Sequence, residues 1–149
     1  MLVLLVSCTE TVSENKLSDL ANTYVQIISS EKNIESFAAL YADSILYSDP
    51  IWGATDQIKL DTLKLWFKPV FDPNTGWDFE INSIATDKSN NVFALKGYCQ
   101  DLATGERRLI TSWYKVKNGK IYEQTDLTPW SLNSLKFSPR FEEALKNYE

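Results

Sequence analysis

The chain of 149 residues contains no histidine. This absence excludes Ser-His-Asp and Cys-His nucleophilic catalysis and imidazole general bases, and it removes the usual ligand of most zinc and non-haem iron sites. A carboxylate is then the ordinary side chain that remains as a base near neutral pH. We therefore expect no metal and no cofactor.

Cysteine and positive charge are also scarce. The two cysteines, Cys8 and Cys99, form no CxxC pattern, and Cys99 lies in an apolar stretch that predicts a buried thiol. The 15 basic residues are outnumbered by 20 acidic ones, for a net charge of −5. Since binding to phosphate requires a basic face, this balance argues against a nucleic-acid partner.

Long apolar runs are missing too, because no segment approaches the roughly 20 residues that cross a bilayer. A short run, Met1 to Val6, precedes Cys8, and Leu5-Val6-Ser7-Cys8 resembles the lipobox of bacterial lipoproteins, in which the cysteine is lipidated. Residues 1–16 are thus predicted to be a lipoprotein signal remnant and tether that anchors the chain in the bacterial cell envelope. The alternative is a frayed N-terminus of a cytoplasmic protein, favoured by the lack of Lys or Arg before the run.

Residues 17–149 are predicted to form a single domain. Apolar side chains recur at helical spacing from Leu17 to Ile28 and again in a short helix around Phe37. Thr55 can cap a third helix that ends near Pro69, and a last helix is expected over residues 140–148.

Between these helices the hydrophobic period indicates strands. A short strand ends at Asp49, and long strands are predicted from Trp77 onwards, over 92–100, 109–116 and 121–127. Asn118-Gly119 is a strong hairpin signal. Helices followed by an antiparallel meander predict an α+β fold, a cone-shaped curved antiparallel sheet wrapped around the N-terminal helices. The mouth of such a cone is a common small-molecule site.

Asp49 ends its strand directly before Pro50, which holds it in extended conformation. Its neighbours Tyr47 and Trp52 are large and mostly apolar, and loss of hydration among such groups raises a carboxyl pKa and makes the group a better proton acceptor. The alternative is a turn aspartate that bonds its own backbone.

In its element order, its Tyr41-Ala42-Asp43…Asp49-Pro50…Gly53 stretch and its Asn118-Gly119 hairpin, the chain resembles the nuclear transport factor 2-like superfamily, in the SnoaL-like and ketosteroid-isomerase-like branch. The resemblance covers roughly Leu17 to Trp130 and implies a cystatin-like roll. It implies that Asp49 stands at the place of the isomerases' general base and Tyr24 at that of their oxyanion donor. Ketosteroid isomerase is itself a worked example of this chemistry, with a base aspartate, a tyrosine and a protonated aspartic acid.

Two further positions are implied by the same resemblance. Counting back from the hairpin places Ser112 where the isomerases keep their protonated acid, and a serine is the weaker donor. Asp126 lies on the last strand, as does an acid of SnoaL-like polyketide cyclases, and alternation puts it on one face with Gln124 and Thr128. An equally open alternative is that Asp126 is an ordinary strand-end residue.

Further residues are expected to line the cavity. These wall residues are Tyr47, Trp52, Trp66, Tyr98, Trp113, Gln124, Thr128 and Trp130. Aromatic residues at strand spacing are also common in cores, which is the alternative for each of them.

The sequence leaves two functions open. One is an envelope-anchored module whose apolar, acid-bearing pocket binds a small hydrophobic ligand, with pairing of two copies through their sheets as a further possibility. The other is an isomerase-like or cyclase-like enzyme in which Asp49 takes a proton beside the carbonyl of a small apolar compound while Tyr24 and Ser112 bind the oxyanion.

Overall fold

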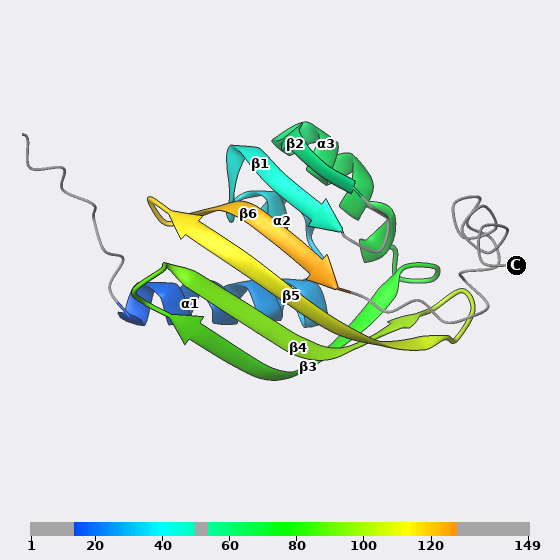
Figure 1. Cartoon of the computed structure of the whole chain (residues 1–149). Helices are drawn as coiled ribbons and strands as arrows, with labels where there is room; N and C mark the ends of the chain where they lie inside the picture. Colours follow the sequence, from blue (N-terminus) through cyan, green and yellow to red (C-terminus); the bar gives the residue numbers. More distant parts are fainter. Residues whose placement is uncertain (1–13, 50–53, 128–149) are drawn as a thin grey trace, which may run out of the picture.

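A curved sheet of six strands, in the order β2-β1-β6-β5-β4-β3, is the frame of the computed structural model (Figure 1). The structure describes residues 14–49 and 54–127. The strands in chain order are β1 (Tyr41–Asp49), β2 (Ala54–Lys59), β3 (Trp77–Asp87), β4 (Val92–Asp101), β5 (Arg107–Lys117) and β6 (Lys120–Leu127).

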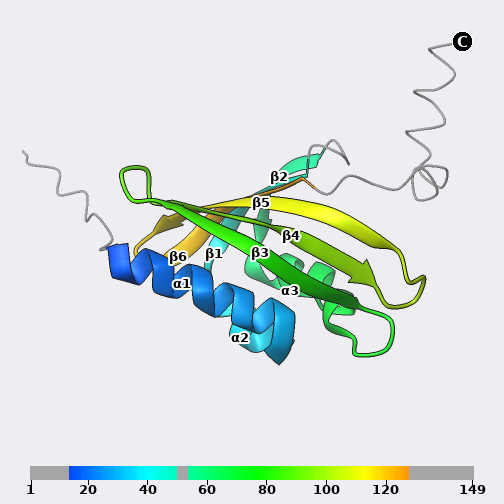
Figure 2. The ribbon, with the colours of Figure 1, turned by 90° about the horizontal axis from the view of Figure 1, so that it is seen from below.

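Three α-helices lie on one face of this sheet (Figure 2). They are α1 (Glu14–Gln26), α2 (Ile34–Ala38) and α3 (Leu60–Phe67), with a π-helical turn η1 (Ile27–Glu31) after α1 and a 3₁₀ turn η2 (Pro69–Phe71) after α3. No helix of the described residues covers the opposite face. The predicted α+β class, with a curved sheet against N-terminal helices, is confirmed.

The break between the first two helices has a local cause. The Lys32 N–H donates to the Ile27 carbonyl at 2.7 Å, which closes the wide turn of η1, and Lys32 then adopts a left-handed backbone conformation (φ 48°). Asn33 restarts the helix, because its side-chain oxygen accepts from the backbone N–H groups of Glu35 and Ser36 at 2.9 and 3.1 Å. The wide turn allows two successive residues, Ile27 and Ile28, to be buried.

One strand pairing differs from the expected antiparallel sheet. β1 pairs with β6 in parallel, whereas all other neighbours are antiparallel. β3 to β6 form the predicted meander, and the Asn118-Gly119 turn has positive φ at both residues (53° and 72°), as a two-residue hairpin requires. β1, which follows α2 in the chain, pairs with the remaining edge of β6 and runs in the same direction.

The expected third helix begins later than Thr55. Residues 54–59 form β2, which pairs with the outer edge of β1, and α3 starts at Leu60. This expectation was wrong because the edge of β1 offers backbone hydrogen bonds that a helix over the same residues would leave unmade. The predicted helix over 140–148 lies outside the described residues.

The core lies between the sheet and the helices. Phe37 at the middle of α2, Ile45 on β1, Leu63 on α3 and Phe93 on β4 have no exposed surface. Gly97 on β4 permits the curvature, because a Cβ there would come 2.2 Å from the Glu80 carbonyl oxygen of β3. Cys99 is buried as expected, and burial raises the pKa of its thiol to about 11.

No helix in the part of the chain that the structure describes is long and apolar enough to span a bilayer.

Candidate functional site

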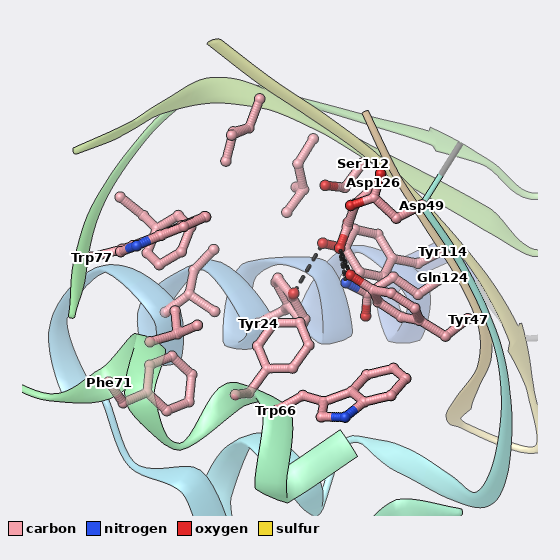
Figure 3. Close-up of a pocket in the computed structure, with 16 residues that line it drawn as sticks. Tyr24, Tyr47, Asp49, Trp66, Phe71, Trp77, Ser112, Tyr114, Gln124 and Asp126 are labelled. Carbon is pink, nitrogen blue, oxygen red and sulfur yellow. Dashed lines mark hydrogen bonds between the residues drawn. The ribbon is translucent and has the colours of Figure 1, made fainter. Parts of the chain in front are cut away.

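A cavity of about 260 Å³ lies between the inner face of the sheet and helices α1 and α3 (Figure 3). Its wall is mainly aromatic and aliphatic, with a few polar side chains. The aromatic residues are Tyr24, Tyr47, Trp66, Phe67, Phe71, Trp77, Phe79 and Tyr114; the aliphatic ones are Ile28, Val70, Leu95 and Ile110; the polar ones are Asp49, Ser112, Gln124 and Asp126.

Strand register gathers the polar side chains at one end of the cavity. Ser48 of β1 lies opposite Thr125 of β6, so that Asp49 and Asp126 are the next residues of the two parallel strands. On the other side of β6, Ser112 of β5 lies directly opposite Asp126. Asp49, Asp126 and Ser112 therefore form one row across three neighbouring strands, and their side chains lie close together in Figure 3.

A second row lies two residues along the same strands. Tyr47 of β1 is opposite Gln124 of β6, which is opposite Tyr114 of β5. Because alternate residues of a strand share a face, both rows point toward the helices.

Asp126 is the acceptor on which this network converges. Its Oδ2 accepts hydrogen bonds from the Tyr47 hydroxyl at 2.9 Å and from Gln124 Nε2 at 2.8 Å. Burial raises the pKa of Asp126 above its ordinary value, and the negative charge of Asp49 adds to this, whereas hydrogen bonds from Ser112, Tyr47 and Gln124 oppose it. The effect of desolvation is the largest of these, so Asp126 holds its proton more readily than an exposed aspartate.

Three buried tyrosines extend the network into the core. The Tyr114 hydroxyl donates to the Tyr24 hydroxyl at 2.9 Å, and the Tyr41 hydroxyl donates to Gln124 Oε1. The rings of Tyr24 and Tyr41 meet edge-on, with centroids 6.5 Å apart. Burial raises the pKa of all three phenols well above 10, so they remain protonated donors.

Most predicted site residues that lie in the described ranges come together here. Tyr24, Tyr47, Asp49, Trp66, Ser112, Gln124 and Asp126 all line the cavity. Asp49 is buried, with 7% of its surface exposed. Trp66 packs edge-on against Tyr47, with ring centroids 5.6 Å apart, and is itself 44% exposed at the rim.

Two predicted wall residues, Tyr98 and Trp113, are misplaced by the sequence analysis. Both lie on the open face of the sheet, away from the helices, and are 38% and 41% exposed. The reason is strand alternation, since Trp113 stands between the inward-facing Ser112 and Tyr114, and Tyr98 precedes the buried Cys99. Cys8, Trp52, Thr128 and Trp130 lie outside the described residues.

Some residues of the site were not predicted. Tyr114 is two residues from Ser112 and so shares its face, and Tyr41 was noted only in the stretch that carries the family resemblance. Trp77 and Phe79 also line the cavity, and Trp77 lies at the end opposite the carboxyls (Figure 3). Among the described residues, no group of His, Cys, Asp or Glu side chains is arranged to hold a metal ion.

The family follows from comparison with known sequences. The model of the SnoaL-like domain matches residues 21–124, well over half of the chain, and the chain therefore belongs to the SnoaL-like domain family. No curated protein is similar enough in sequence to count as a match.

Solved structures share the fold at low sequence identity. A candidate ketosteroid isomerase from Kribbella flavida DSM 17836 has a TM-score of 0.66 at 18% identity, over 78% of this chain and 80% of that one. A protein with a ketosteroid isomerase-like fold from Catenulispora acidiphila DSM 44928, in complex with trimethylamine, has a TM-score of 0.60 at 15% identity, over 78% and 88%. An LEH-like epoxide hydrolase from M. tuberculosis has a TM-score of 0.61 at 12% identity, over 77% and 84%.

The raised pKa of Asp126 has a consequence for stability. The folded state disfavours the ionised carboxyl. The contribution of protonated Asp126 to the free energy of unfolding is therefore complete below the unfolded Asp pKa of about 4, and it is lost as the pH rises through the folded pKa. We expect the melting temperature of Asp126→Asn, relative to that of the wild type, to rise as the pH increases from about 4 to about 8. Circular dichroism melts at a series of pH values measure this.

Asp87 provides a matched control of opposite sign. It is an exposed turn residue whose pKa is lowered by hydrogen bonds from Asn90 and Ser89. The stability that the ionised Asp87 contributes is therefore lost as the pH falls below about 4. The melting temperature of Asp87→Asn, relative to that of the wild type, should then rise only in acid. An Asp126→Asn difference that is constant with pH would contradict the assignment.

Proposed function

We propose that this domain binds a small, largely apolar molecule in the cavity and holds the polar end of that molecule beside Asp49 and Asp126. The observation that carries this proposal is the division of the cavity wall: twelve of its sixteen residues are aromatic or aliphatic, and the four others gather at one end. Small-molecule sites typically combine an apolar wall with a few convergent polar groups. The fold alone does not decide the function, because it hosts both ligand-binding proteins and isomerases or cyclases.

Neighbouring residues of β5 provide a sharp test. Ile110 lines the cavity, whereas Leu109 is on the open face. We expect Ile110→Trp to fill the cavity and to weaken binding of the neutral naphthalene dye prodan by roughly tenfold or more, and Leu109→Trp to have little effect. The measurement is the blue shift of dye emission on titration, and thermal melts check that both variants fold.

Prodan binding that is equal in both variants would place the dye elsewhere on the protein. Absence of dye binding to the wild type, together with a screen of small apolar compounds that gives no thermal stabilisation, would exclude the proposed function.

A second candidate is a carboxylate-dependent enzyme, and the close placement of two carboxyls favours it. Asp126 accepts hydrogen bonds from Tyr47 and Gln124, and Asp49 lies beside it at the end of β1. Two neighbouring carboxyls can divide the roles of acid and base when their surroundings differ. This candidate also requires the Tyr24 hydroxyl to donate to a substrate oxyanion.

For this second candidate, 2-tetralone in D₂O is a suitable probe. Asp49 would take a proton from the carbon next to the carbonyl, the C–H electron pair would form an enolate, and a deuteron from solvent would return to that carbon. We expect Asp49→Asn to slow the protein-dependent exchange by roughly a hundredfold or more, and Asp56→Asn on the exposed edge strand to leave it unchanged. Proton NMR follows the exchange, and a full rate in Asp49→Asn would rule out this base.

We also propose that the chain is anchored in the cell envelope through a lipid on Cys8. What supports this is the Leu5-Val6-Ser7-Cys8 stretch followed by a polar tract. In the organism that makes the protein, we expect an acylated mature N-terminus at Cys8 and a detergent-phase distribution that Cys8→Ser abolishes. An unmodified Cys8 by mass spectrometry would contradict the anchor.

A further inference from the structure

The polar end of the cavity presents mainly hydrogen-bond acceptors to a ligand, because three tyrosine protons and the Gln124 amide are already used within the protein. Each tyrosine hydroxyl has one proton to give. Tyr47 gives its proton to Asp126, Tyr114 gives its proton to Tyr24, and Tyr41 gives its proton to Gln124.

Tyr24 joins the same network as an acceptor. Its hydroxyl accepts the proton of Tyr114, and its ring packs edge-on against Tyr41, with centroids 6.5 Å apart. The proton of Tyr41 goes to Gln124, and Gln124 in turn donates to Asp126, so these donors lead, one after another, to a carboxylate.

The formal charge of the cavity wall is also one-sided. Of the sixteen described residues that line it, two are aspartates and none is Lys or Arg. Nearby basic side chains have acidic partners of their own: Lys32 pairs with Asp78, Lys64 pairs with Glu35 at 2.7 Å, and Arg108 pairs with Glu106 at 2.6 Å. A ligand anion would be repelled by this wall, and a neutral carbonyl would find few donors.

The aromatic part of the wall suits the opposite charge. The rings of Tyr24, Tyr47 and Trp66 come from helices and a strand around the cavity (Figure 3), whereas Trp77 already has the Arg108 guanidinium 5.7 Å from its ring centroid. A cation within about 6 Å of such a ring is attracted to its π-face, most strongly for Trp. The volume of about 260 Å³ lies just below the roughly 300–1,000 Å³ of sites for drug-sized ligands, so the ligand is small.

We propose that the ligand of this cavity is a small organic cation, an alkylammonium or arylalkylammonium compound whose nitrogen lies beside Asp49 and Asp126 and whose apolar body lies against the aromatic wall. The inference rests on the proposed function and narrows the ligand class. It differs from the carbonyl candidate because it uses the carboxylates as charge partners and asks for no donor from Tyr24.

A pair of probes with one shape and different charge tests this inference. Benzyltrimethylammonium and neopentylbenzene differ by the replacement of a charged nitrogen with carbon, and phenylacetate supplies a small aromatic anion. We expect the cation to displace prodan at a concentration at least roughly tenfold lower than its neutral isostere, and the anion not to compete. Isothermal titration with the cation provides an independent affinity.

Variants of the full chain then assign the preference to the cavity. The double variant Asp49→Asn/Asp126→Asn should bind the two isosteres with equal affinity, and Trp66→Leu should weaken binding of the cation by a larger factor than binding of neopentylbenzene. Asp72 is an exposed turn residue outside this cavity, and Asp72→Asn, as the matched acidic control, should retain the full preference. Prodan binding and thermal melts confirm that each variant is folded.

The outcomes separate this inference from the proposed function. If the neutral isostere binds as tightly as the cation, or if the double Asn variant keeps the preference, the cation assignment is wrong while the binding function stands. If prodan and both isosteres all fail to bind to the wild type, the proposed function fails together with the inference.

Discussion

The parallel pairing of β1 with β6 is the contact on which the site depends. β6 arrives at the end of a hairpin meander, and its remaining edge is closed by a strand that comes from the helices at the other end of the sequence. Because the two strands are parallel and side by side, their last inward residues, Asp49 and Asp126, come to the same end of the sheet. An antiparallel pairing would have placed these carboxyls at opposite ends of the two strands. The acidic end of the cavity thus follows from one choice of strand direction.

Placing two carboxyls together in an apolar cavity is costly, and the remaining polar residues offset that cost. An unpaired buried polar group costs about 1–3 kcal/mol, and a buried charge costs more. Tyr47, Gln124 and Ser112 supply hydrogen bonds to Asp126, and Tyr41 holds Gln124 in the orientation that this requires. Each of these tyrosines, considered alone, resembles a catalytic proton donor, but in the structure their hydroxyls hold Asp126 and Gln124 in place.

Local periodicity predicted the class of fold, most element positions and the shared face of Gln124 and Asp126, whereas the places of Asp49, Tyr24 and Ser112 in the site came from the family resemblance. The expectation for Tyr98 and Trp113 was wrong because successive side chains of a strand lie on opposite faces of the sheet, and a large aromatic residue can lie on the open face. The sequence did not indicate β2, whose strand conformation is imposed by the edge of β1 and not by its own residues. The hydrogen bonds from Tyr114 to Tyr24 and from Tyr41 to Gln124 join residues 90 and 83 positions apart, and no spacing rule would reveal them.

The direction of these hydrogen bonds also bears on how the SnoaL-like fold divides between binding and catalysis. A tyrosine serves an oxyanion only if its proton points into the cavity, and here the protons of Tyr47, Tyr114 and Tyr41 are each given to another oxygen of the protein. A protonated acid at the position of Ser112 would supply a further donor. The serine that stands there lies directly opposite Asp126. The residue at this position of β5 thus bears on the supply of protons to the cavity, and through it on the ligand charge that we propose for the cavity.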